Sequence, residues 1–497
     1  HEPPPICEYR TALRSARDSQ MSGGAMTVVR AETIVELLEQ SSSVLYDEHG
    51  SGRTCGDMLA SGRALAVDLA AAGIGRGDRI AVQMQNSELY VDVLVAAAVG
   101  GFVVMSVNTR FAPALADSII ERAGARMVIR GATDVPPRVD RDPEFATRTA
   151  DERFVIFTTS GTTSAPKLVV HQQRSITAHA ADVAEAFGYH DESVIMLPVP
   201  LCGVFGFTVL WGALAGHSTV YMPTAFDAEQ TGRLVQEHGV TSMHGSDDMF
   251  HRLLATDWDL STIRSSGYAR FNSALDGIVE RCEARGVPLA GLYGMSEVQA
   301  LYAFRGASGL PMEQRWRAAG ELVSPQAERR VVDDELQLQG PSLFEGYLAD
   351  GGAEIDHELT AANFDGPWFK TGDLAIEDGP RSFEYITRIG DVMRLGGFLV
   401  APVEVEGAIM RLDEIDQAQV VAVSLAKGAR PVAFVILAAG AQLDEQAVID
   451  HCAETLARFK CPVRVVAVDE FPVTDGPNGV KIQRNKLREM GAALLTP

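Results

Sequence analysis

A hydroxyl-rich loop with one lysine is the strongest chemical signal in the sequence. Thr158 to Lys167 read TTSGTTSAPK and connect an expected strand at 153–157 to another at 168–171. Backbone N–H groups, several hydroxyls and one cation on a short loop can wrap phosphate oxygens. A Walker A loop is excluded, because its GxxxxGK[ST] opens a helix whereas Lys167 precedes a β-branched strand. Taken alone, the segment could also be a plain polar hairpin loop.

Further motifs follow the loop in a fixed order. They are YGMSE at 293–297, WFKTGD at 368–373, RIGD at 388–391 followed by PVEVE at 402–406, and PVTDGPNGVKIQR at 472–484. With the loop, this series resembles the adenylate-forming superfamily of acyl-CoA synthetases, adenylation domains and luciferases. It is most similar to acyl- or aryl-CoA ligases, and the resemblance spans about residues 30–490.

The resemblance implies an ATP-dependent carboxylic acid:CoA ligase with two half-reactions. The acid attacks the α-phosphate of MgATP to form an acyl-adenylate and pyrophosphate, and a thiol then displaces AMP to form a thioester. ATP, Mg²⁺ and coenzyme A are therefore the expected cofactors, with the phosphopantetheine of a carrier protein as the alternative thiol. A carboxylic acid that is a small molecule, and not a macromolecule, is the expected substrate.

The residue types suit the roles that the resemblance assigns. Asp373 can accept hydrogen bonds from both ribose hydroxyls, and Arg388 is a fixed cation for ribose or phosphate. Tyr293 offers an aromatic face to adenine, and Glu297 is a hard oxygen ligand for Mg²⁺. Lys481 would stabilise the charge that builds up between the acid and the α-phosphate. Singly, Asp373 could cap a turn, Tyr293 could be core and Lys481 could be a solvated tail residue.

The resemblance assigns further residues to both parts of the site. Lys167 joins Lys481 and Glu297 as a catalytic residue, and Asp391 is the expected hinge. The other expected nucleotide-binding residues are Thr159, Ser160, Gly161, Thr162, Thr163, Ala269, Gly294 and Ser296. The expected acid pocket contains Cys202, Gly203, Phe205, Gly206, Asp247, Gly267, Gly291 and Met295.

Several positions depart from the family pattern. Ser164 and Leu168 stand where glycines are common, so the loop loses the easy access of glycine to positive φ. Val480 is an insertion before the expected catalytic lysine, for which Lys486 and Lys460 are weaker candidates. These departures leave open a relative that has lost adenylation and only binds or thioesterifies acyl-AMP.

The segment PLCGVFG at 200–206 resembles the acid-binding PLFHxxG segment of the family. Gly206 stands where amino-acid-activating members carry an aspartate for the α-ammonium group, which disfavours an α-amino acid substrate. Cys202, Gly203, Gly206 and Gly267 are all small, and this predicts a roomy apolar pocket for a bulky acid.

Asp247 and Asp248 occupy a stretch that is often apolar in the family. They could bind a polar group on a distal part of the acid. They could instead cap the helix that begins near Met249, which is the favoured interpretation.

Helix and strand periods alternate in the first part of the chain, which indicates parallel sheets with crossover helices. The resemblance adds a distorted β-barrel. We expect an α/β N-terminal domain at 26–388, and a small mobile α+β domain at 389–497 that rotates so that Lys481 leaves before the thiol enters. Gly396 and Gly397 would then face the site. Residues 1–25 begin HEPPP and are expected to be a disordered or vector-derived lead-in.

Composition excludes several classes. A net charge of −23 argues against sequence-independent DNA binding, and no nucleic-acid partner is expected. Six cysteines without a CxxC pair predict a reduced, cytoplasmic protein without a zinc site. Residues 193–226 contain no charged side chain, but prolines and glycines interrupt them, so a buried strand, loop and helix are expected instead of a membrane span.

Alternative functions remain open at this point. A stand-alone adenylation enzyme that loads a carrier protein is the main one. A luciferase-like oxygenase needs the same adenylation, and a nucleotide-sensing protein would bind ATP without releasing pyrophosphate. The identity of the acid and the choice between monomer and homodimer are not determined by the motifs.

Overall fold

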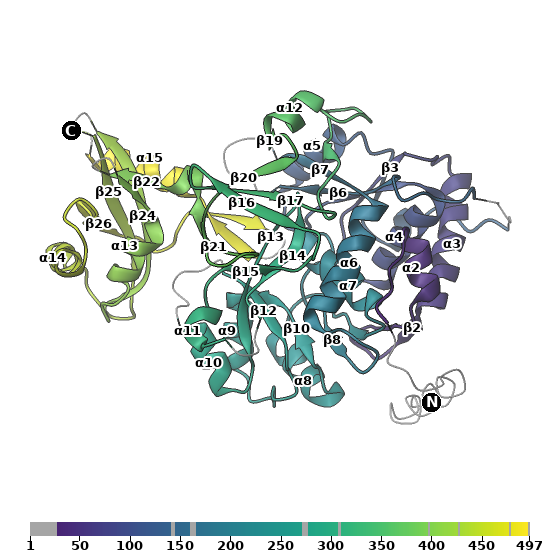
Figure 1. The fold of residues 1–497 in the computed structure, drawn as a ribbon, viewed down its shortest axis with the longest axis horizontal. Helices are drawn as coiled ribbons and strands as arrows, with labels where there is room; N and C mark the ends of the chain where they lie inside the picture. Colours follow the sequence, from purple (N-terminus) through teal and green to yellow (C-terminus); the bar gives the residue numbers. More distant parts are fainter. Residues whose placement is uncertain are drawn as a thin grey trace.

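The structure is a computed structural model that describes residues 27–140, 145–159, 166–270, 277–306, 310–395, 398–425, 428–476 and 479–495, without the side chains of 313, 425, 474–476 and 479–481. The predicted lead-in at 1–25 lies outside these residues. Figure 1 shows a large lobe, from α2 (Ile34–Gln40) to β21 (Ser382–Arg388), and a small lobe, from β22 (Met393–Leu395) to α15 (Arg484–Leu495). The predicted α/β class, with a large and a small unit, is confirmed.

The first sheet of the large lobe carries the two ends of the phosphate loop. Its strands, in spatial order, are β18 (Gly346–Tyr347), β7 (Leu168–Gln172), β6 (Arg153–Thr158), β4 (Val103–Ser106), β3 (Arg79–Val82) and β5 (Met127–Ile129). The four strands from β6 to β5 are parallel, as the alternating periods predict, and β7 and β18 add antiparallel partners. The loop therefore bridges two neighbouring strands of one sheet.

The second sheet explains the long uncharged stretch. Its strands are β10 (Ser242–Met243), β8 (Val194–Met196), β9 (Thr219–Tyr221), β1 (Val44–Tyr46) and β2 (Gly52–Thr54). Between β8 and β9 the chain forms α7 (Val204–Ala215), whose residues after Val204 are all buried. The expected strand, loop and helix are thus present. Among the described residues, no helix combines the length and the apolar character needed to cross a bilayer.

The third sheet contains most of the motif residues. It consists of β11 (Gly245–Ser246), β12 (Ser266–Ala269), β13 (Leu289–Met295), β14 (Gln299–Phe304), β15 (Ala319–Leu322), β21, β20 (Trp368–Glu377), β17 (Glu335–Gln339) and β16 (Glu328–Val332), with β19 (Phe364–Asp365) beside β20. From β13 to β20, in the spatial order β13, β14, β15, β21, β20, the strands pair antiparallel in series, which brings motifs about 80 residues apart in sequence into one sheet.

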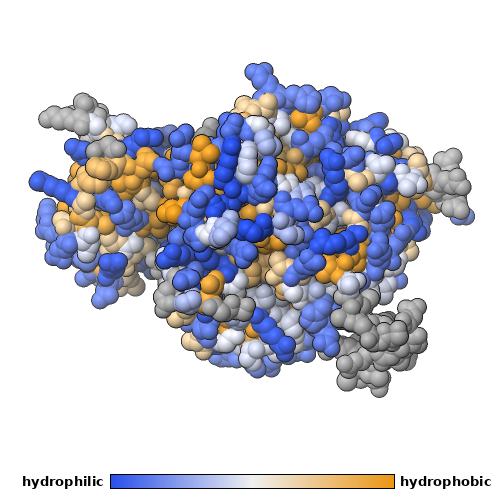
Figure 2. Space-filling view, viewed as in Figure 1, coloured by the Kyte–Doolittle hydropathy of each residue, from blue (hydrophilic) through white to orange (hydrophobic). Residues whose placement is uncertain are grey.

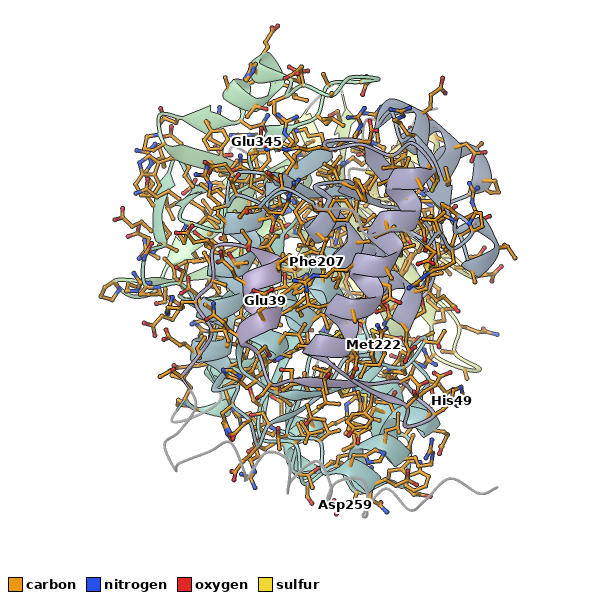
Figure 3. The ribbon with its side chains drawn as sticks, turned by 90° about the vertical axis from the view of Figure 1, so that its right-hand side faces the viewer. Glu39, His49, Phe207, Met222, Asp259 and Glu345 are labelled. Carbon is orange, nitrogen blue, oxygen red and sulfur yellow. The ribbon has the colours of Figure 1, made fainter. Side chains whose placement is uncertain are left out.

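Helices cover the sheets and fill the space between them. The remaining helices of the large lobe are α3 (Cys55–Ala71), α4 (Glu88–Gly100), α5 (Pro113–Arg122), α6 (Gln173–Phe187), α8 (Ala228–His238), α9 (Asp247–Leu254), α10 (Ile278–Ala284), α11 (Met312–Arg315) and α12 (His357–Ala362). α4 and α7 are apolar around most of their circumference, which is typical of helices buried on all sides. Phe207 of α7 is fully buried, whereas Glu39, His49 and Asp259 are exposed, and Figure 3 places His49 and Asp259 toward the edge of the molecule.

The small lobe has the predicted alternation of strands and helices. After η3 (Ile389–Asp391) and β22 come β23 (Phe398–Val400), α13 (Pro402–Ile409), β24 (Ile415–Leu425), β25 (Gly428–Leu437), α14 (Glu445–Thr455), β26 (Arg464–Ala467) and the hairpin of β27 (Val473–Gly476) with β28 (Gly479–Ile482). It has its own core around Val420, Ala433 and Val448. Large exposed apolar side chains such as Phe398, which is 60% exposed, are frequent here, and Figure 2 shows hydrophobic residues on this lobe.

Candidate active site

A carboxylate held by two partners lies between β20, β21 and β13. β20 and β21 pair so that Asp373 stands opposite Arg388. Arg388 Nε lies 3.0 Å from Asp373 Oδ1, and the Tyr293 hydroxyl donates to Asp373 Oδ2 at 2.6 Å. Arg388 Nη1 also donates to the carbonyl of Thr371 at 2.8 Å. Three separate motifs thus meet at the predicted ribose carboxylate.

Charge and burial fix the protonation states of this group. Burial by itself would lower the pKa of Arg388, but the charge of Asp373, together with smaller contributions from Tyr293, Tyr385 and Glu297, outweighs burial and raises the pKa. Burial, followed by the charge of Asp373, raises the pKa of Tyr293 well above its usual value. The phenol therefore stays protonated and donates. The Tyr293 ring packs edge-on against Phe383 within a core cluster. Tyr293 therefore lies between this core and Asp373, the predicted ribose ligand.

Glu297 lies in the turn between β13 and β14, and its side chain is only 4% exposed. Its Oε1 accepts a hydrogen bond from the Tyr347 hydroxyl at 3.0 Å. Burial raises the pKa of Glu297, whereas Tyr347, Arg388 and Lys167 act in the opposite direction. The influence of both cations on one carboxylate shows that the phosphate loop, the glutamate motif and the arginine motif converge.

The surroundings of Glu297 fit the Mg²⁺ that the family implies. Mg²⁺ on a nucleotide needs only one or two protein carboxylates, because phosphate oxygens and water complete its octahedron. Glu297 would be such a single hard ligand, and no group of three or more metal-binding side chains exists among the described residues. The turn itself is held from behind: His171 Nε2 donates to the carbonyl of Ser296 at 2.7 Å, and the Ser296 hydroxyl donates to the carbonyl of Thr158 at 3.2 Å.

Lys167 is anchored at the end of the phosphate loop. Its N–H donates to Thr159 Oγ1 at 3.0 Å, and the Thr159 N–H donates to its carbonyl at the same distance. Its Nζ donates to Asn363 Oδ1 at 3.1 Å and lies 4.4 Å from the centre of the Tyr347 ring. Burial lowers the pKa of this ammonium. The predicted phosphate contacts Ser160, Gly161, Thr162 and Thr163, and the departure Ser164, lie outside the described residues.

The predicted catalytic lysine stands on a β-hairpin of the small lobe. The backbone of Lys481 belongs to β28, where it pairs with Thr474 of β27. Figure 1 shows this hairpin in yellow, extending from the small lobe toward the large one. Burial raises the pKa of Tyr385 on β21. The positive charge of Arg484, at the start of α15, is near enough to act on Tyr385 and to lower this pKa in part. The segment after Lys481 thus lies close to the strand that carries Arg388, while the Lys481 side chain is outside the described part.

The predicted hinge residue, Asp391, contacts the last helix. Arg488 of α15 donates to the carbonyl of Gly390 at 2.9 Å and lies 3.1 Å from Asp391 Oδ1. The helix that follows the catalytic hairpin is therefore linked directly to the point at which the lobes join. Gly396 and Gly397, predicted to face the thiol, lie outside the described residues.

The glycines of the acid side require a correction. A Cβ on Gly206 would lie 2.5 Å from the carbonyl oxygen of Pro200, and one on Gly267 would lie 2.6 Å from the side chain of Leu292. A Cβ on Gly291 would lie 2.0 Å from the carbonyl oxygen of Arg317. Glycine is required at these three positions because backbone or side-chain atoms of other residues in the same polypeptide approach closely. The small size of these residues therefore does not by itself create a roomy pocket.

The other predicted acid-side residues cluster at α7 and the third sheet. Gly203 precedes α7 as its N-cap, and Phe205 and Cys202 are buried. Burial raises the pKa of the Cys202 thiol to about 11. Met295 ends β13 two residues from Glu297, and Gly294 packs against the backbone of Ala300.

A cavity of about 160 Å³ lies beside this cluster, next to Ala269 at the end of β12. Asp247, Tyr268, Arg270, Glu280 and Trp316 are among its lining residues. Ile278 and Val279 line it too, so its walls combine charged, aromatic and aliphatic side chains.

Asp247 is not the helix cap that the sequence favours. Ser246 is the N-cap of α9, and its hydroxyl accepts from the Met249 N–H at 3.3 Å. Asp247 is the first helical residue, and its Oδ1 accepts from the Asp248 N–H at 2.9 Å. Because its side chain is only 1% exposed and lines the cavity, Asp247 stays a candidate for contact with the acid.

Family models cover most of the chain. The model described as "AMP-binding enzyme" matches residues 39–348, and "AMP-binding enzyme C-terminal domain" matches residues 404–475. The chain belongs to the AMP-binding enzyme family. The resemblance to adenylate-forming enzymes is thereby confirmed, and with it the predicted class of AMP-forming acid–thiol ligase.

Similar proteins agree with the family. The 2-succinylbenzoate–CoA ligase of Listeria innocua is 29% identical, over 67% of this chain and 68% of its own. The 3-[(3aS,4S,7aS)-7a-methyl-1,5-dioxo-octahydro-1H-inden-4-yl]propanoyl:CoA ligase of Mycobacterium tuberculosis is also 29% identical, over 86% and 91%. ATP-bound MatB from Rhodopseudomonas palustris shares the fold with a TM-score of 0.82 at 21% identity, covering 94% of this chain and 100% of its own.

The sequence motifs missed three residues that hold this AMP-binding site together. Tyr347, Asn363 and His171 each contact a motif residue from outside the motifs. Burial lowers the pKa of His171 to about 4, so it is neutral and donates through Nε2. In the sequence, only their positions relative to the motifs could have indicated these residues. Tyr347 and Asn363 precede WFKTGD, and His171 lies on the strand that follows the phosphate loop.

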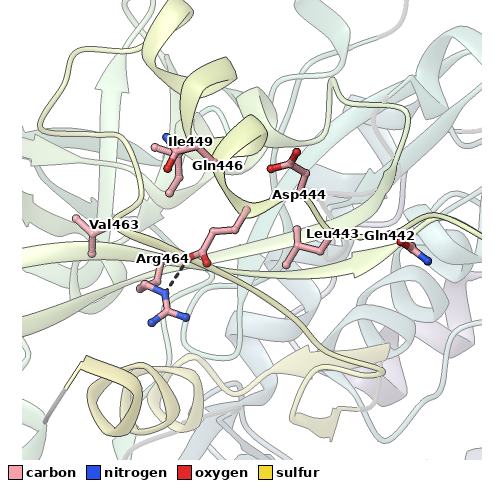
Figure 4. A pocket seen from close by; sticks show the side chains of 8 residues that line it. Gln442, Leu443, Asp444, Gln446, Ile449, Val463 and Arg464 are labelled. Atoms are coloured by element: carbon pink, nitrogen blue, oxygen red, sulfur yellow. Dashed lines mark hydrogen bonds and ion pairs between the residues drawn. The ribbon is translucent and has the colours of Figure 1, made fainter.

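A hollow of about 720 Å³ on the small lobe is separate from this site. Figure 4 shows its lining, which comes from the start of α14 and from β26, with Arg464 paired to Glu445. None of the motif residues lines it.

Proposed function

We propose that this protein is an ATP-dependent carboxylic acid:CoA ligase that works through an acyl-adenylate. The observation that carries the proposal is the convergence at Glu297: Tyr347 donates to this buried carboxylate while its ring contacts Lys167 of the phosphate loop, and the charge of Arg388 also acts on it. Asp373, which Arg388 and Tyr293 hold in place, completes a nucleotide site with both cations and carboxylates. The CoA ligases among its relatives support coenzyme A as the thiol.

Each step follows from the placement of these residues. The substrate carboxylate displaces pyrophosphate from the α-phosphate, forming the acyl–O–P bond of acyl-AMP. Asp373 orients the ribose, and Lys167 offsets the charge of the leaving phosphates. Glu297 would hold Mg²⁺, which when bound would further neutralise the phosphate charge. In the second half the coenzyme A thiol gives up its proton to solvent, its sulfur bonds to the acyl carbon, and AMP leaves with the electron pair of the broken acyl–oxygen bond.

We propose two domains, at 26–388 and 389–497, that rotate about Asp391 between the half-reactions. The hairpin of β27 and β28 extends toward the large lobe, which suits the first half-reaction, in which Lys481 is the catalytic residue (Figure 1). The exposed apolar residues around Phe398 would be covered by the large lobe after rotation. The cytoplasmic location and the monomeric or homodimeric state also remain predictions.

We propose a bulky, mainly apolar acid as the substrate, and not an α-amino acid. The backbone around Gly206 leaves no space for the aspartate that would hold an α-ammonium group. The relatives named above act on an aromatic acid and on a bicyclic propanoate, both of which are bulky. The apolar helix α7 supports the same substrate class.

Acid-dependent exchange of pyrophosphate into ATP tests the function. A panel of aryl, fatty and polycyclic acids is assayed with the wild type, with Lys481→Ala and with Lys486→Ala as the matched lysine control. We expect exchange with one acid class, loss of exchange in Lys481→Ala and retention in Lys486→Ala. Thioester formation from supplied acyl-AMP, without exchange for any acid, would show that adenylation has been lost and would overturn the proposal.

A further inference from the structure

Two residues outside the motifs surround the ammonium group of Lys167. Asn363 follows α12 as its C-cap and accepts from Lys167 Nζ, while the Tyr347 ring lies 4.4 Å from the same nitrogen. They reach the loop from different directions, since Tyr347 belongs to β18, which pairs with β7, and Asn363 directly precedes β19. Lys167 itself is partly buried between them.

The orientation of the Asn363 amide is determined by its other contact. Its Nδ2 donates to the carbonyl of Leu359 at 2.8 Å, so its Oδ1 is the atom that faces Lys167. The helix that supplies Leu359 is itself anchored, because Asp356 caps it by accepting from the Leu359 N–H at 2.8 Å. The Thr360 hydroxyl of the same helix accepts from the Tyr347 N–H at 3.0 Å. One short helix therefore places both contacts of the lysine.

We propose that Asn363 and the Tyr347 ring are positioning residues that hold the Lys167 ammonium ready for the β- and γ-phosphates of ATP and for pyrophosphate. This inference rests on the proposed function. A neutral amide and a π-face orient a cation without neutralising its charge, so the lysine remains available to a phosphate. A carboxylate at position 363 would instead form an ion pair and compete with the phosphate. The neutral side chain at this position is thus part of phosphate recognition.

The Tyr347 hydroxyl connects this cradle to Glu297. The ring contacts Lys167 while the hydroxyl donates to Glu297 Oε1. Tyr347→Phe keeps the ring and removes only the hydroxyl, whereas Tyr347→Leu removes both. The two variants therefore separate the contact with the lysine from the contact with the carboxylate.

The test compares the half-reactions in Asn363→Asp, Asn363→Ala and the control Asp356→Ala. The control removes the cap of α12 without removing a group that contacts Lys167. We expect the KM values for ATP and for pyrophosphate to rise about tenfold in Asn363→Asp, because the new carboxylate would pair with Lys167 and compete with the phosphate. The rise should be smaller in Asn363→Ala, which only removes one hydrogen bond to the charged ammonium group. Thioester formation from supplied acyl-AMP should stay within about twofold of the wild type, since AMP carries no β- or γ-phosphate.

The other outcomes are equally decisive. We expect Tyr347→Leu to raise the KM for pyrophosphate more than Tyr347→Phe does, because only Tyr347→Phe keeps the ring that contacts Lys167. Equal losses in both half-reactions, or a rise in Asp356→Ala as large as that in Asn363→Asp, would overturn the inference and show a purely structural role. Absence of acid-dependent exchange in the wild type would instead refute the proposed function.

Discussion

The nucleotide side and the acid side of the site are built in different ways. On the nucleotide side, side chains from distant parts of the sequence hold two buried carboxylates: Arg388 and Tyr293 bind Asp373, and Tyr347 binds Glu297. On the acid side, Gly206 and Gly267 are small because backbone or side-chain atoms press against them. Motif chemistry therefore identifies the first region well, whereas residue size is a poor guide to the shape of the second. The following predictions test this contrast, beginning with the largest effect.

Glu297→Gln should separate activity from stability on the nucleotide side. We expect acid-dependent exchange to fall by about 100-fold or more, as when one preorganised electrostatic group is removed from an active site. The melting temperature should be unchanged or higher, because burial disfavours the charged carboxylate and the amide carbonyl can still accept from Tyr347. Exchange rates and thermal unfolding measure both. A parallel fall in activity and melting temperature would show that Glu297 is structural.

Gly206→Ala should act on stability before it acts on substrate choice. The new methyl group would meet the carbonyl oxygens of Pro200 and Val199, and overpacking of this kind costs about 1–3 kcal/mol of unfolding free energy. The control is Gly407→Ala in α13, where a Cβ meets open space and a helical alanine is expected to stabilise slightly. Urea unfolding gives the values. A fully stable Gly206→Ala that prefers smaller acids would restore the interpretation of a roomy pocket.

The acid side should also make stability dependent on pH. Burial lowers the pKa of His244 to about 3, and its Nδ1 accepts from the Gly267 N–H at 2.8 Å. In the unfolded chain the imidazole titrates near 6.5. The stabilisation that the neutral, buried His244 gives to the folded state is therefore complete above about pH 6.5, and it declines as the pH falls from there toward the pKa in the folded protein. Between pH 7 and pH 5 we expect a loss of about 2 kcal/mol from this residue.

Unfolding at the two pH values, in the wild type and in His244→Gln, measures this loss. The free energy of unfolding of His244→Gln should fall less on acidification than that of the wild type, because the variant lacks the contribution of His244. The other buried histidines titrate equally in both proteins. An equal loss in both proteins would show that His244 does not carry the effect.

The smallest effect distinguishes the cap from a substrate contact at α9. Ser246→Ala should lower the unfolding free energy by about 1 kcal/mol, because it removes the acceptor for the Met249 N–H. Asp247→Asn keeps an oxygen for the Asp248 N–H and should change stability less, while it shifts the preference among acids with distal polar groups. Denaturation and the acid panel check the two variants. A larger loss of stability in Asp247→Asn would return the capping role to Asp247.

Much of the fold was predictable from local pattern. The strands at 153–157 and 168–171 end within one residue of their expected bounds, because β-branched runs flanked by turns leave few alternatives. The uncharged stretch at 193–226 forms a strand, a buried helix and a strand, as its prolines and glycines indicate. The capping of α9 was wrong by one residue, since serine and aspartate are both good N-caps and only the backbone dihedral angles distinguish them.

What the sequence determined by itself was the chemistry: the ordered motifs specify the family and the groups that act on ATP, because carboxylates, a fixed cation and a hydroxyl-rich loop have few other uses in that combination. Only the tertiary structure decided which groups touch. The antiparallel pairing of β20 and β21 sets Asp373 opposite Arg388, and the folding of α12 onto β18 brings Asn363 and Tyr347 to Lys167. The close approach of the Val199 and Pro200 carbonyl oxygens to Gly206 could not be predicted from the sequence either. The space around a residue depends on which atoms the folded chain packs against it.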